Sequence, residues 1–363
     1  MSGSVFGKSF RISTWGESHG RSLGVVIDGC PAGIPLSEED LLKDLARRKP
    51  GVREFSTARS ESDAPEIMSG VFQGLTTGTP IAVMIRNTDE RSGDYSNIKD
   101  SFRPGHGDFG YWSKYGLRDY RGGGRSSGRE TVARVAAGAV AKKILALIGA
   151  EVFAYTLEIG GVRAERFDLT ERDKNPLCFP DKIAAEKASA YLSECVKKGD
   201  TAGGIVECVA TGIPAGLGEP VFDKLDAALG AAVLSIGAVK GVEFGAGFAA
   251  ARMTGSENND GFITKDGKTG KATNNSGGIL AGISDGSPIV LRAAMKPTPS
   301  ISIPQKTVDT KGSEVEIQIK GRHDPVIVPR AVVVVEAMTA VTLADFLLRA
   351  MGGKASDIER FFR

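Results

Sequence analysis

The sequence is short of net charge, cysteine and histidine, and each shortage excludes a class of protein. Its 363 residues carry 46 Lys+Arg against 44 Asp+Glu, so a general basic coat for nucleic acid is not supported. The four cysteines form no C-x-x-C pair, which indicates free thiols in a reducing cytosol. The three histidines lie far apart without H-x-x-x-H spacing, which argues against a metal site.

Targeting segments and common nucleotide signatures are also missing. The first ten residues, MSGSVFGKSF, lack the apolar core of a signal peptide, and no run of 18 apolar residues predicts a membrane span. We therefore expect a soluble, cytoplasmic protein. No Walker A string is found, and no G-x-G-x-x-G lies at a strand-to-helix junction, which disfavours ordinary ATP and dinucleotide folds.

One stretch, Arg103–Glu130, concentrates positive charge and glycine just before an apolar helical pattern. It holds five Arg, one Lys and eight Gly against three acidic residues. Glycines let backbone N–H groups approach a ligand, and a helix N-terminus adds partial positive charge. The pattern predicts a site for a multiply charged anion. The alternatives are a plain glycine turn and a disordered Arg-Gly tail, but such tails repeat their unit and lack apolar residues.

The helix that follows has a predictable start. Ser127–Glu130 fits a capping box, which leaves Arg125 and Ser126 beside N–H groups that point outward. Apolar residues then repeat at helical spacing, interrupted only by Lys143. These apolar residues are Val132, Val135, Ala136, Ala139, Val140, Ile144, Leu147 and Ile148.

The rest of the chain alternates predicted strands and helices. Ser37 is expected to cap the first helix, and the polar, glycine- and asparagine-rich segment 257–277 is expected to be a long loop, as is 14–20. Strands are predicted over 5–12, 23–28, 150–162 and 204–211, strands alternating with glycine turns over 70–86, and helices over 37–48, 183–198, 222–236 and 331–351.

The two halves of the chain resemble each other. The string GVFQGLTTGTPIAV from Gly70 recurs in outline as GILAGISDGSPIVL from Gly278. His106, ahead of the central helix, then has His323 as its counterpart ahead of the C-terminal helix. We expect a single domain over 1–363, built by duplication from two pseudo-symmetric halves of about 1–150 and 200–363.

Histidines and cations are the candidates for chemistry. His19, His106 and His323 each lie in a glycine- or arginine-rich loop. An imidazole beside a phosphate dianion has a raised pKa and can protonate a leaving group; a purely structural role is the alternative. Lys296 precedes two prolines and two hydroxyls, which suits a rigid polar ligand. Further cations are Arg47 and Arg48, which end a helix where positive charge is favoured anyway, and Arg53, Arg59 and Arg322.

Six motifs, in this order, resemble the chorismate synthase family. They are GESHG at 16–20, FRPGHGD at 102–108, KYGLRDYRGGGRSSGRET at 114–131, GEPVFDKLDA at 218–227, KPTPSI at 296–301 and GRHDP at 321–325. The resemblance spans nearly the whole chain. It implies an α+β fold, a β-α-β sandwich with a helical layer between two antiparallel sheets, in a homotetramer.

The resemblance also implies an activity. The family comprises lyases of the shikimate pathway, in aromatic amino acid biosynthesis, that convert 5-enolpyruvylshikimate 3-phosphate to chorismate by trans-1,4-elimination of phosphate. They are flavoproteins that require reduced FMN (FMNH2) without net redox change. Because this chain lacks a dinucleotide fingerprint, we expect NADPH only as an indirect reductant, used by an external flavin reductase. No nucleic acid or membrane partner is expected.

The family's functional positions map onto this sequence by the same resemblance. His19 would protonate the departing phosphate, His106 would lie near the N1 side of the flavin, and Asp324 would help its N5 region accept the ring hydrogen. Cofactor-binding positions would be Arg125, Ser126, Ser127, Gly237, Ala238, Ala281, Lys296, Pro297, Thr298, Pro299, Ser300 and Arg322, and substrate- or NADP-binding positions Arg48, Arg53, Arg103 and Arg129.

The chain departs from the family pattern at three places. Gly237 replaces a common Asn before Ala238, which removes a side-chain contact to flavin and leaves backbone contacts. Ala281 replaces a frequent glycine, and Glu54 stands where an arginine is usual, with Arg53 one place earlier. Two other functions stay open at this point: an NADPH-using flavin reductase, and an RNA-binding module whose affinity would fall with salt.

Overall fold

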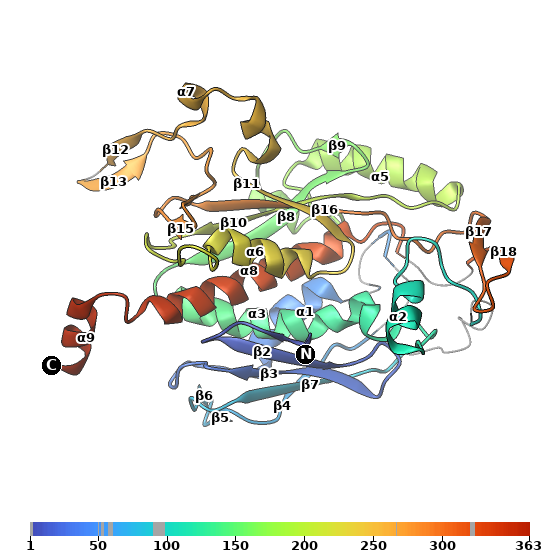
Figure 1. The fold of residues 1–363 in the computed structure, drawn as a ribbon, viewed down its shortest axis with the longest axis horizontal. Helices are drawn as coiled ribbons and strands as arrows, with labels where there is room; N and C mark the ends of the chain where they lie inside the picture. The colour runs from blue at the N-terminus through green and yellow to red at the C-terminus, as the bar shows by residue number, and fades with distance from the viewer. Residues whose placement is uncertain are drawn as a thin grey trace.

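Two antiparallel five-stranded sheets enclose a layer of helices in the computed structural model (Figure 1). The structure describes residues 3–49, 51, 54–56, 61–89, 99–265, 267–319 and 324–363.

The predicted α+β sandwich is confirmed. The first sheet has the order β1 (Val5–Phe6), β2 (Arg11–Gly16), β3 (Ser22–Asp28), β7 (Ile81–Arg86), β4 (Pro65–Ile67). The second has the order β11 (Val239–Phe244), β16 (Ile289–Met295), β10 (Gly204–Thr211), β8 (Glu151–Ile159), β9 (Val162–Arg163).

The helices between the sheets form two tiers. α1 (Glu38–Arg48) and α3 (Thr131–Ala146) lie on the first sheet, and α6 (Leu225–Leu234) and α8 (Val328–Ala350) lie on the second (Figure 1). The tiers meet where α3 packs on α8. A β-carbon on Gly138 would lie 2.3 Å from Cβ of Ala337, so the missing side chain lets the two helices approach closely.

Burial follows the residue pattern of each element. In β7 the side chains of Ile81, Val83 and Ile85 are buried and alternate with more exposed neighbours, the period of a strand with one face on the core. α8 is apolar nearly all round, which is typical of an internal helix. By length and composition α8 could cross a membrane. However, 89% of its most apolar 18-residue stretch is buried inside the protein, so α8 is a core helix.

A buried ion network joins the helical tiers to the second sheet. Glu336 on α8 is 2% exposed and accepts hydrogen bonds from Arg47 at 2.7 and 2.9 Å, from Lys142, and from the backbone N–H of Ala154 at 3.0 Å. Burial alone would raise the pKa of Glu336, but Arg47 and Lys142 lower it below its ordinary value. Arg47 therefore has a structural partner, which fits the structural alternative for that residue.

The remaining helices and strands complete the fold. They are the helices α2 (Asp108–Tyr115), α4 (Leu169–Arg172), α5 (Lys182–Lys197), α7 (Gly255–Asn258) and α9 (Ala355–Phe362), the 3-10 turns η2 (Gly124–Ser126), η3 (Gly128–Glu130) and η4 (Gly247–Arg252), and the paired strands β5 (Val71–Phe72) with β6 (Leu75–Thr76), β12 (Phe262–Lys265) with β13 (Lys268–Lys271), β14 (Ile279–Leu280) with β15 (Ile283–Ser284), and β17 (Gln305–Val308) with β18 (Glu314–Ile317).

Both copies of the repeated string fold alike. β5 and β6 form a hairpin that precedes β7, and β14 and β15 form a hairpin that precedes β16. The first sheet draws its strands from 5–86 and the second from 151–295. The gene duplication itself stays a prediction.

The predicted helices over 37–48, 183–198 and 331–351 and the strand over 204–211 are confirmed within a few residues. The loop predicted over 257–277 is wrong in part, because β12 and β13 form a hairpin inside it. Likewise Thr14–Gly16 belongs to β2, so only the residues after Gly16 form the expected loop.

The predicted capping box at the start of α3 is only half right. Ser127 accepts a hydrogen bond from the backbone N–H of Arg129, as a cap does. Glu130, however, pairs with Arg134 at 2.9 Å, and the turn η3 precedes α3. At the other end Leu147 and Ile148 lie beyond the helix and are exposed, so the predicted stripe is two residues too long.

Candidate functional site

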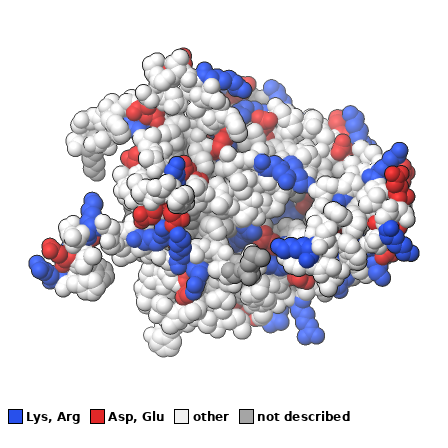
Figure 2. All heavy atoms as spheres, in the orientation of Figure 1, with Lys and Arg blue, Asp and Glu red and all other residues white. Residues whose placement is uncertain are grey.

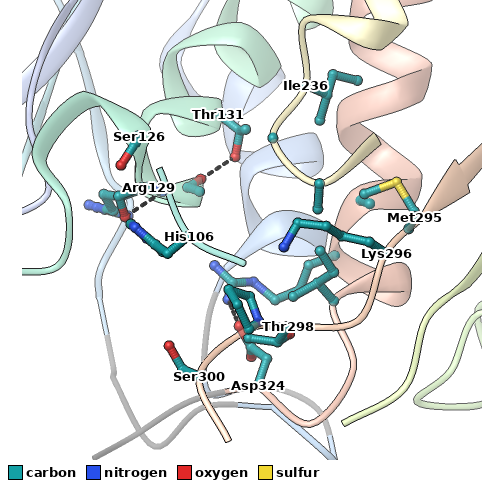
Figure 3. Close-up of a pocket in the computed structure, with 18 of the residues that line it drawn as sticks. His106, Ser126, Arg129, Thr131, Ile236, Met295, Lys296, Thr298, Ser300 and Asp324 are labelled. Carbon is teal, nitrogen blue, oxygen red and sulfur yellow. Dashed lines mark hydrogen bonds and ion pairs between the residues drawn. The ribbon is translucent and has the colours of Figure 1, made fainter. Parts of the chain in front are cut away.

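A cavity of about 360 Å³ lies where α3 and α8 begin and where α1 and α6 end (Figure 3). Thr131 at the start of α3 and Arg330 at the start of α8 both line it. Figure 2 shows Lys and Arg side chains gathered around a hollow on the corresponding side of the molecule. The predicted site residues that line the cavity are Arg48, Arg103, His106, Ser126, Ser127, Arg129, Gly237, Ala238, Lys296, Thr298, Pro299, Ser300 and Asp324.

His19 lies beside the cavity, and Arg125 turns away from it. The buried ring of His19 packs against Gly122, and Gly122 lines the cavity. The Arg125 guanidinium donates through Nη1 to the Gly16 carbonyl at 3.0 Å and through Nη2 to Thr14 Oγ1 at 2.8 Å. Arg125 thus fastens the loop that carries His19 instead of facing the cavity.

Two further predicted residues that the structure describes, Ala281 and Pro297, are not among those that line the cavity. Ala281 lies in the turn between β14 and β15. Pro297 belongs to the lining loop, although its neighbours supply the surface. Arg53, Arg59, Arg322 and His323 lie outside the described residues.

Arg48 and Arg129 share the buried carboxylate of Asp63. Arg48 Nη1 lies 3.3 Å from Asp63 Oδ2, and Arg129 Nη1 contacts Asp63 Oδ1. Burial alone would raise the pKa of Asp63, but the two arginines lower it. Burial and the nearby Arg330 lower the pKa of Arg48 to about 9, which leaves it protonated at neutral pH. The carboxylate therefore holds both guanidiniums in place at the cavity wall.

Asp63 could not be recognised from the sequence. It lies 15 residues from Arg48 and 66 from Arg129 along the chain, and no motif contains it. Its backbone is in the left-handed region, with φ of +49°, which is uncommon outside glycine.

Arg103, His106 and Asp108 form a second buried cluster. His106 Nδ1 lies 2.9 Å from Asp108 Oδ1, and Arg103 donates to Asp108 through Nε at 2.8 Å and Nη2 at 2.9 Å. Burial, Arg103 and Lys296 lower the pKa of His106, although Asp108 opposes the shift. The imidazole is therefore held neutral until a ligand supplies negative charge.

The loop after β16 supplies the opposite wall. Lys296 Nζ donates to the Gly105 carbonyl at 2.9 Å, and Figure 3 shows its side chain reaching across toward His106. Burial and Lys240 lower the pKa of Lys296. Thr298 Oγ1 is buried without a hydrogen-bond partner in the part of the chain that the structure describes. Because buried hydroxyls normally have a partner, this one is suited to a ligand.

Sequence reasoning missed Arg330. Its Nη1 donates to Asp324 Oδ2 at 2.5 Å, and its Nε donates to the Arg48 carbonyl at 3.4 Å. It thus connects two predicted site residues. A signal was present, because an arginine in the first turn of an apolar helix is electrostatically unfavourable.

An apolar wall was missed as well. Among the described lining residues, Arg48, Arg103, Arg129, Lys296 and Arg330 are cationic, and Asp324 is the single carboxylate. The apolar lining residues that the sequence did not indicate are Ile236, Met295, Ile327, Ala331 and Val334, which join the predicted Ala238 and Pro299. The cavity therefore suits an anion that also carries a flat or apolar part. Within the described ranges, no group of three His, Cys, Asp or Glu side chains could hold a metal ion.

Known proteins are similar to this chain in sequence and in fold. A family profile described as Chorismate synthase matches residues 10–348. A chorismate synthase of Lachnospira eligens is 58% identical over 365 residues, 100% of both chains, and one of Syntrophobacter fumaroxidans is 60% identical over 348 residues, 96% of this chain and 98% of the other. A crystal structure of chorismate synthase, 33% identical, superposes with a TM-score of 0.76 over 98% of this chain and 97% of that one. The chain therefore belongs to the chorismate synthase family of shikimate-pathway lyases.

Proposed function

We propose that this chain converts 5-enolpyruvylshikimate 3-phosphate to chorismate by trans-1,4-elimination of phosphate at the cavity between α3 and α8. The observation that carries the proposal is the convergence of cationic side chains from both halves of the chain on one cavity. The substrate carries two carboxylates and a phosphate. Each charge-assisted hydrogen bond to such a group contributes about 1.5 to 3 kcal/mol, so several arginines are needed to hold it.

The cavity residues fit reduced FMN. Ile236, Met295 and Val334 offer an apolar surface for a flat ring, and the partnerless hydroxyl of Thr298 and the amine of Lys296 offer polar contacts. When bound, reduced FMN supplies an electron-rich ring that assists cleavage of the C–O bond without net redox change. Gly237 presents only its backbone, in keeping with the loss of a side-chain contact expected from the sequence.

The ionisable residues then take distinct tasks. His19 gives a proton to the departing phosphate, and the arginines hold the anionic groups. Burial, Arg103 and Lys296 lower the pKa of His106 in the free protein; by the family resemblance this residue would lie near the N1 side of the bound flavin, where negative charge would raise its pKa. Asp324, held by Arg330, orients toward the ring hydrogen that leaves. Arg48, Arg103 and Arg129 bind the substrate.

We extend the proposal to the cellular setting. The enzyme works as a homotetramer in the cytoplasm and receives reduced flavin from an external reductase, with NADPH as the indirect electron source. The lack of a dinucleotide fingerprint in the sequence supports a separate reductase as the user of NADPH.

The test is an anaerobic assay that follows chorismate absorbance after mixing protein, reduced FMN and substrate. His106→Ala and Asp324→Asn are expected to lower kcat by about a hundredfold or more, the range of a lost acid–base group. Asp28→Asn is the matched control, because Asp28 makes an exposed ion pair with Arg11 at 2.8 Å on the first sheet. Turnover of either site variant within a few-fold of the parent would contradict the assigned roles.

A further inference from the structure

Three consecutive glycines lie between the two histidines of the site. Gly122, Gly123 and Gly124 have φ of +68°, +87° and +54°, the left-handed region that other residues enter only with strain. Many glycine turns need nothing more than this backbone conformation. Gly116, at the end of α2, has φ of +72° and open space around it, with no atom within 4 Å of an added β-carbon.

Gly122 and Gly123 differ from Gly116 because each faces an imidazole. A β-carbon on Gly122 would lie 2.7 Å from Cε1 and 2.9 Å from Nδ1 of His19. A β-carbon on Gly123 would lie 2.9 Å from Cε1 of His106 and 2.8 Å from Ser126 Oγ. These separations are far below van der Waals contact, so each ring occupies the space that a side chain would take.

We infer that Gly122 and Gly123 are positioning residues that set the places of His19 and His106 against one short piece of backbone. Their α-carbons are about 3.8 Å apart, so both rings are located by neighbouring atoms of the same turn. The inference rests on the roles proposed above for the two histidines. It explains why the run contains consecutive glycines, since each imidazole needs its own gap.

The clash that a side chain would create falls on movable atoms. At Gly16, by contrast, an added β-carbon would lie 2.4 Å from backbone atoms of Leu23 and Ser22, so substitution there disturbs the sheet. At Gly122 and Gly123 the nearest atoms belong to side chains, so the clash falls on an imidazole and not on backbone; for His106 a displacement would also strain its 2.9 Å contact with Asp108. Substitution should therefore displace the imidazoles and leave the fold in place.

Histidine NMR tests this directly, because the chain has only three histidines. With ¹⁵N-histidine-labelled protein, Gly122→Ala is expected to shift the imidazole signals of His19 and leave those of His106, and Gly123→Ala to do the reverse. Gly116→Ala carries the same backbone strain without a clash and should move neither. Turnover should fall about a hundredfold in the two site variants, the scale of an ångström-sized misplacement, and stay within about twofold in the control.

Two outcomes are decisive and differ in meaning. If the signals of both histidines stay in place in Gly122→Ala and Gly123→Ala, the positioning inference is wrong whatever the turnover. If the signals move as expected but turnover does not change, the proposed histidine roles are wrong. The two glycines would then position the imidazoles without affecting catalysis.

A second measurement covers the case in which Gly122→Ala alone folds poorly. His19→Ala removes the two closest contacts of the added β-carbon and leaves Ser18 Oγ at 3.0 Å, so Gly122→Ala should lower the melting temperature less in the His19→Ala background than in the parent. Such non-additivity is expected only for groups in contact. Equal losses in the two backgrounds would overturn the inference.

Discussion

Arg330 offers a sharp test of how the site is held together. Its side chain is 19% exposed, donates to Asp324 Oδ2 at 2.5 Å, and donates to the Arg48 carbonyl at 3.4 Å. Replacing it by methionine keeps the aliphatic packing and removes the cation. Asp324 then loses a charge-assisted hydrogen bond, and the cavity loses one of its described cations.

The magnitude follows from that lost hydrogen bond. A hydrogen bond between charged groups is worth about 1.5 to 3 kcal/mol, which corresponds to a fall in kcat/KM of about 10- to 150-fold. The anaerobic chorismate assay measures it. Arg330→Lys keeps the charge, but a single amine cannot donate to both Asp324 and the Arg48 carbonyl as the guanidinium does. The activity of Arg330→Lys should therefore lie between those of the parent and Arg330→Met.

Arg349 supplies the control, because it is an arginine in the last turn of the same helix and also pairs with a carboxylate, that of Asp223 at 2.5 Å. Arg349→Met should stay within about twofold of the parent. The effects of Arg330→Met and Asp324→Asn should be non-additive, because the two residues act as a pair. Additive losses, or an Arg330→Met enzyme as active as the control, would refute the reasoning.

Three further results are expected. Ala281→Gly should stabilise the protein by about 0.5 to 1 kcal/mol in chemical denaturation, because Ala281 is exposed with φ of +52° and left-handed strain of about 1 to 2 kcal/mol exceeds the added unfolded-state entropy. Glu336→Gln should destabilise by about 3 to 5 kcal/mol at neutral pH. Folding lowers the pKa of Glu336, so its contribution to stability is fully present above the unfolded carboxyl pKa of about 4.3 and is lost as the pH falls from there through the lower folded pKa. The difference in stability between Glu336→Gln and the parent should therefore shrink in acid. NMR titration of His106 should give a pKa below 6.5 in the free protein and a higher one with FMN bound.

Helices could be predicted from the sequence wherever the residues of one segment are enough to determine its secondary structure. Ser37 caps α1, and the apolar run after residue 331 forms α8, because capping and helical period depend on a few neighbouring residues. The hairpin of β12 and β13 was missed because KTGK shows no alternation of apolar and polar residues. Phe262 and Ile263 of β12 are exposed, so no buried face imposes a pattern of apolar residues there.

The sequence identified many residues of the site, but it did not indicate which of them contact one another. Arg47 and Arg48 are neighbours in sequence, yet one pairs with Glu336 and the other faces the cavity, because successive helical residues point about 100° apart. Asp63 has no sequence signal at all, since its partners come from distant segments. Motifs identify candidate chemistry and can include a supporting carboxylate such as Asp108, whereas a carboxylate outside every motif, such as Asp63, is recognised only in the folded chain.

The sandwich itself explains why the chemistry lies at this end of the helices. α3 comes from one half and α8 from the other, and residues of their first turns line the same cavity. Acidic side chains normally neutralise a helix N-terminus, and α1, which begins elsewhere, has Glu38, Glu39 and Asp40 in its first turn. Neither α3 nor α8 has an acidic residue there, and α8 carries Arg330 instead. Glu130 does lie at the N-cap of α3, whereas α8 has no such carboxylate at its start. The start of α8 and the surrounding cations thus create an excess of positive charge that an anionic ligand can neutralise.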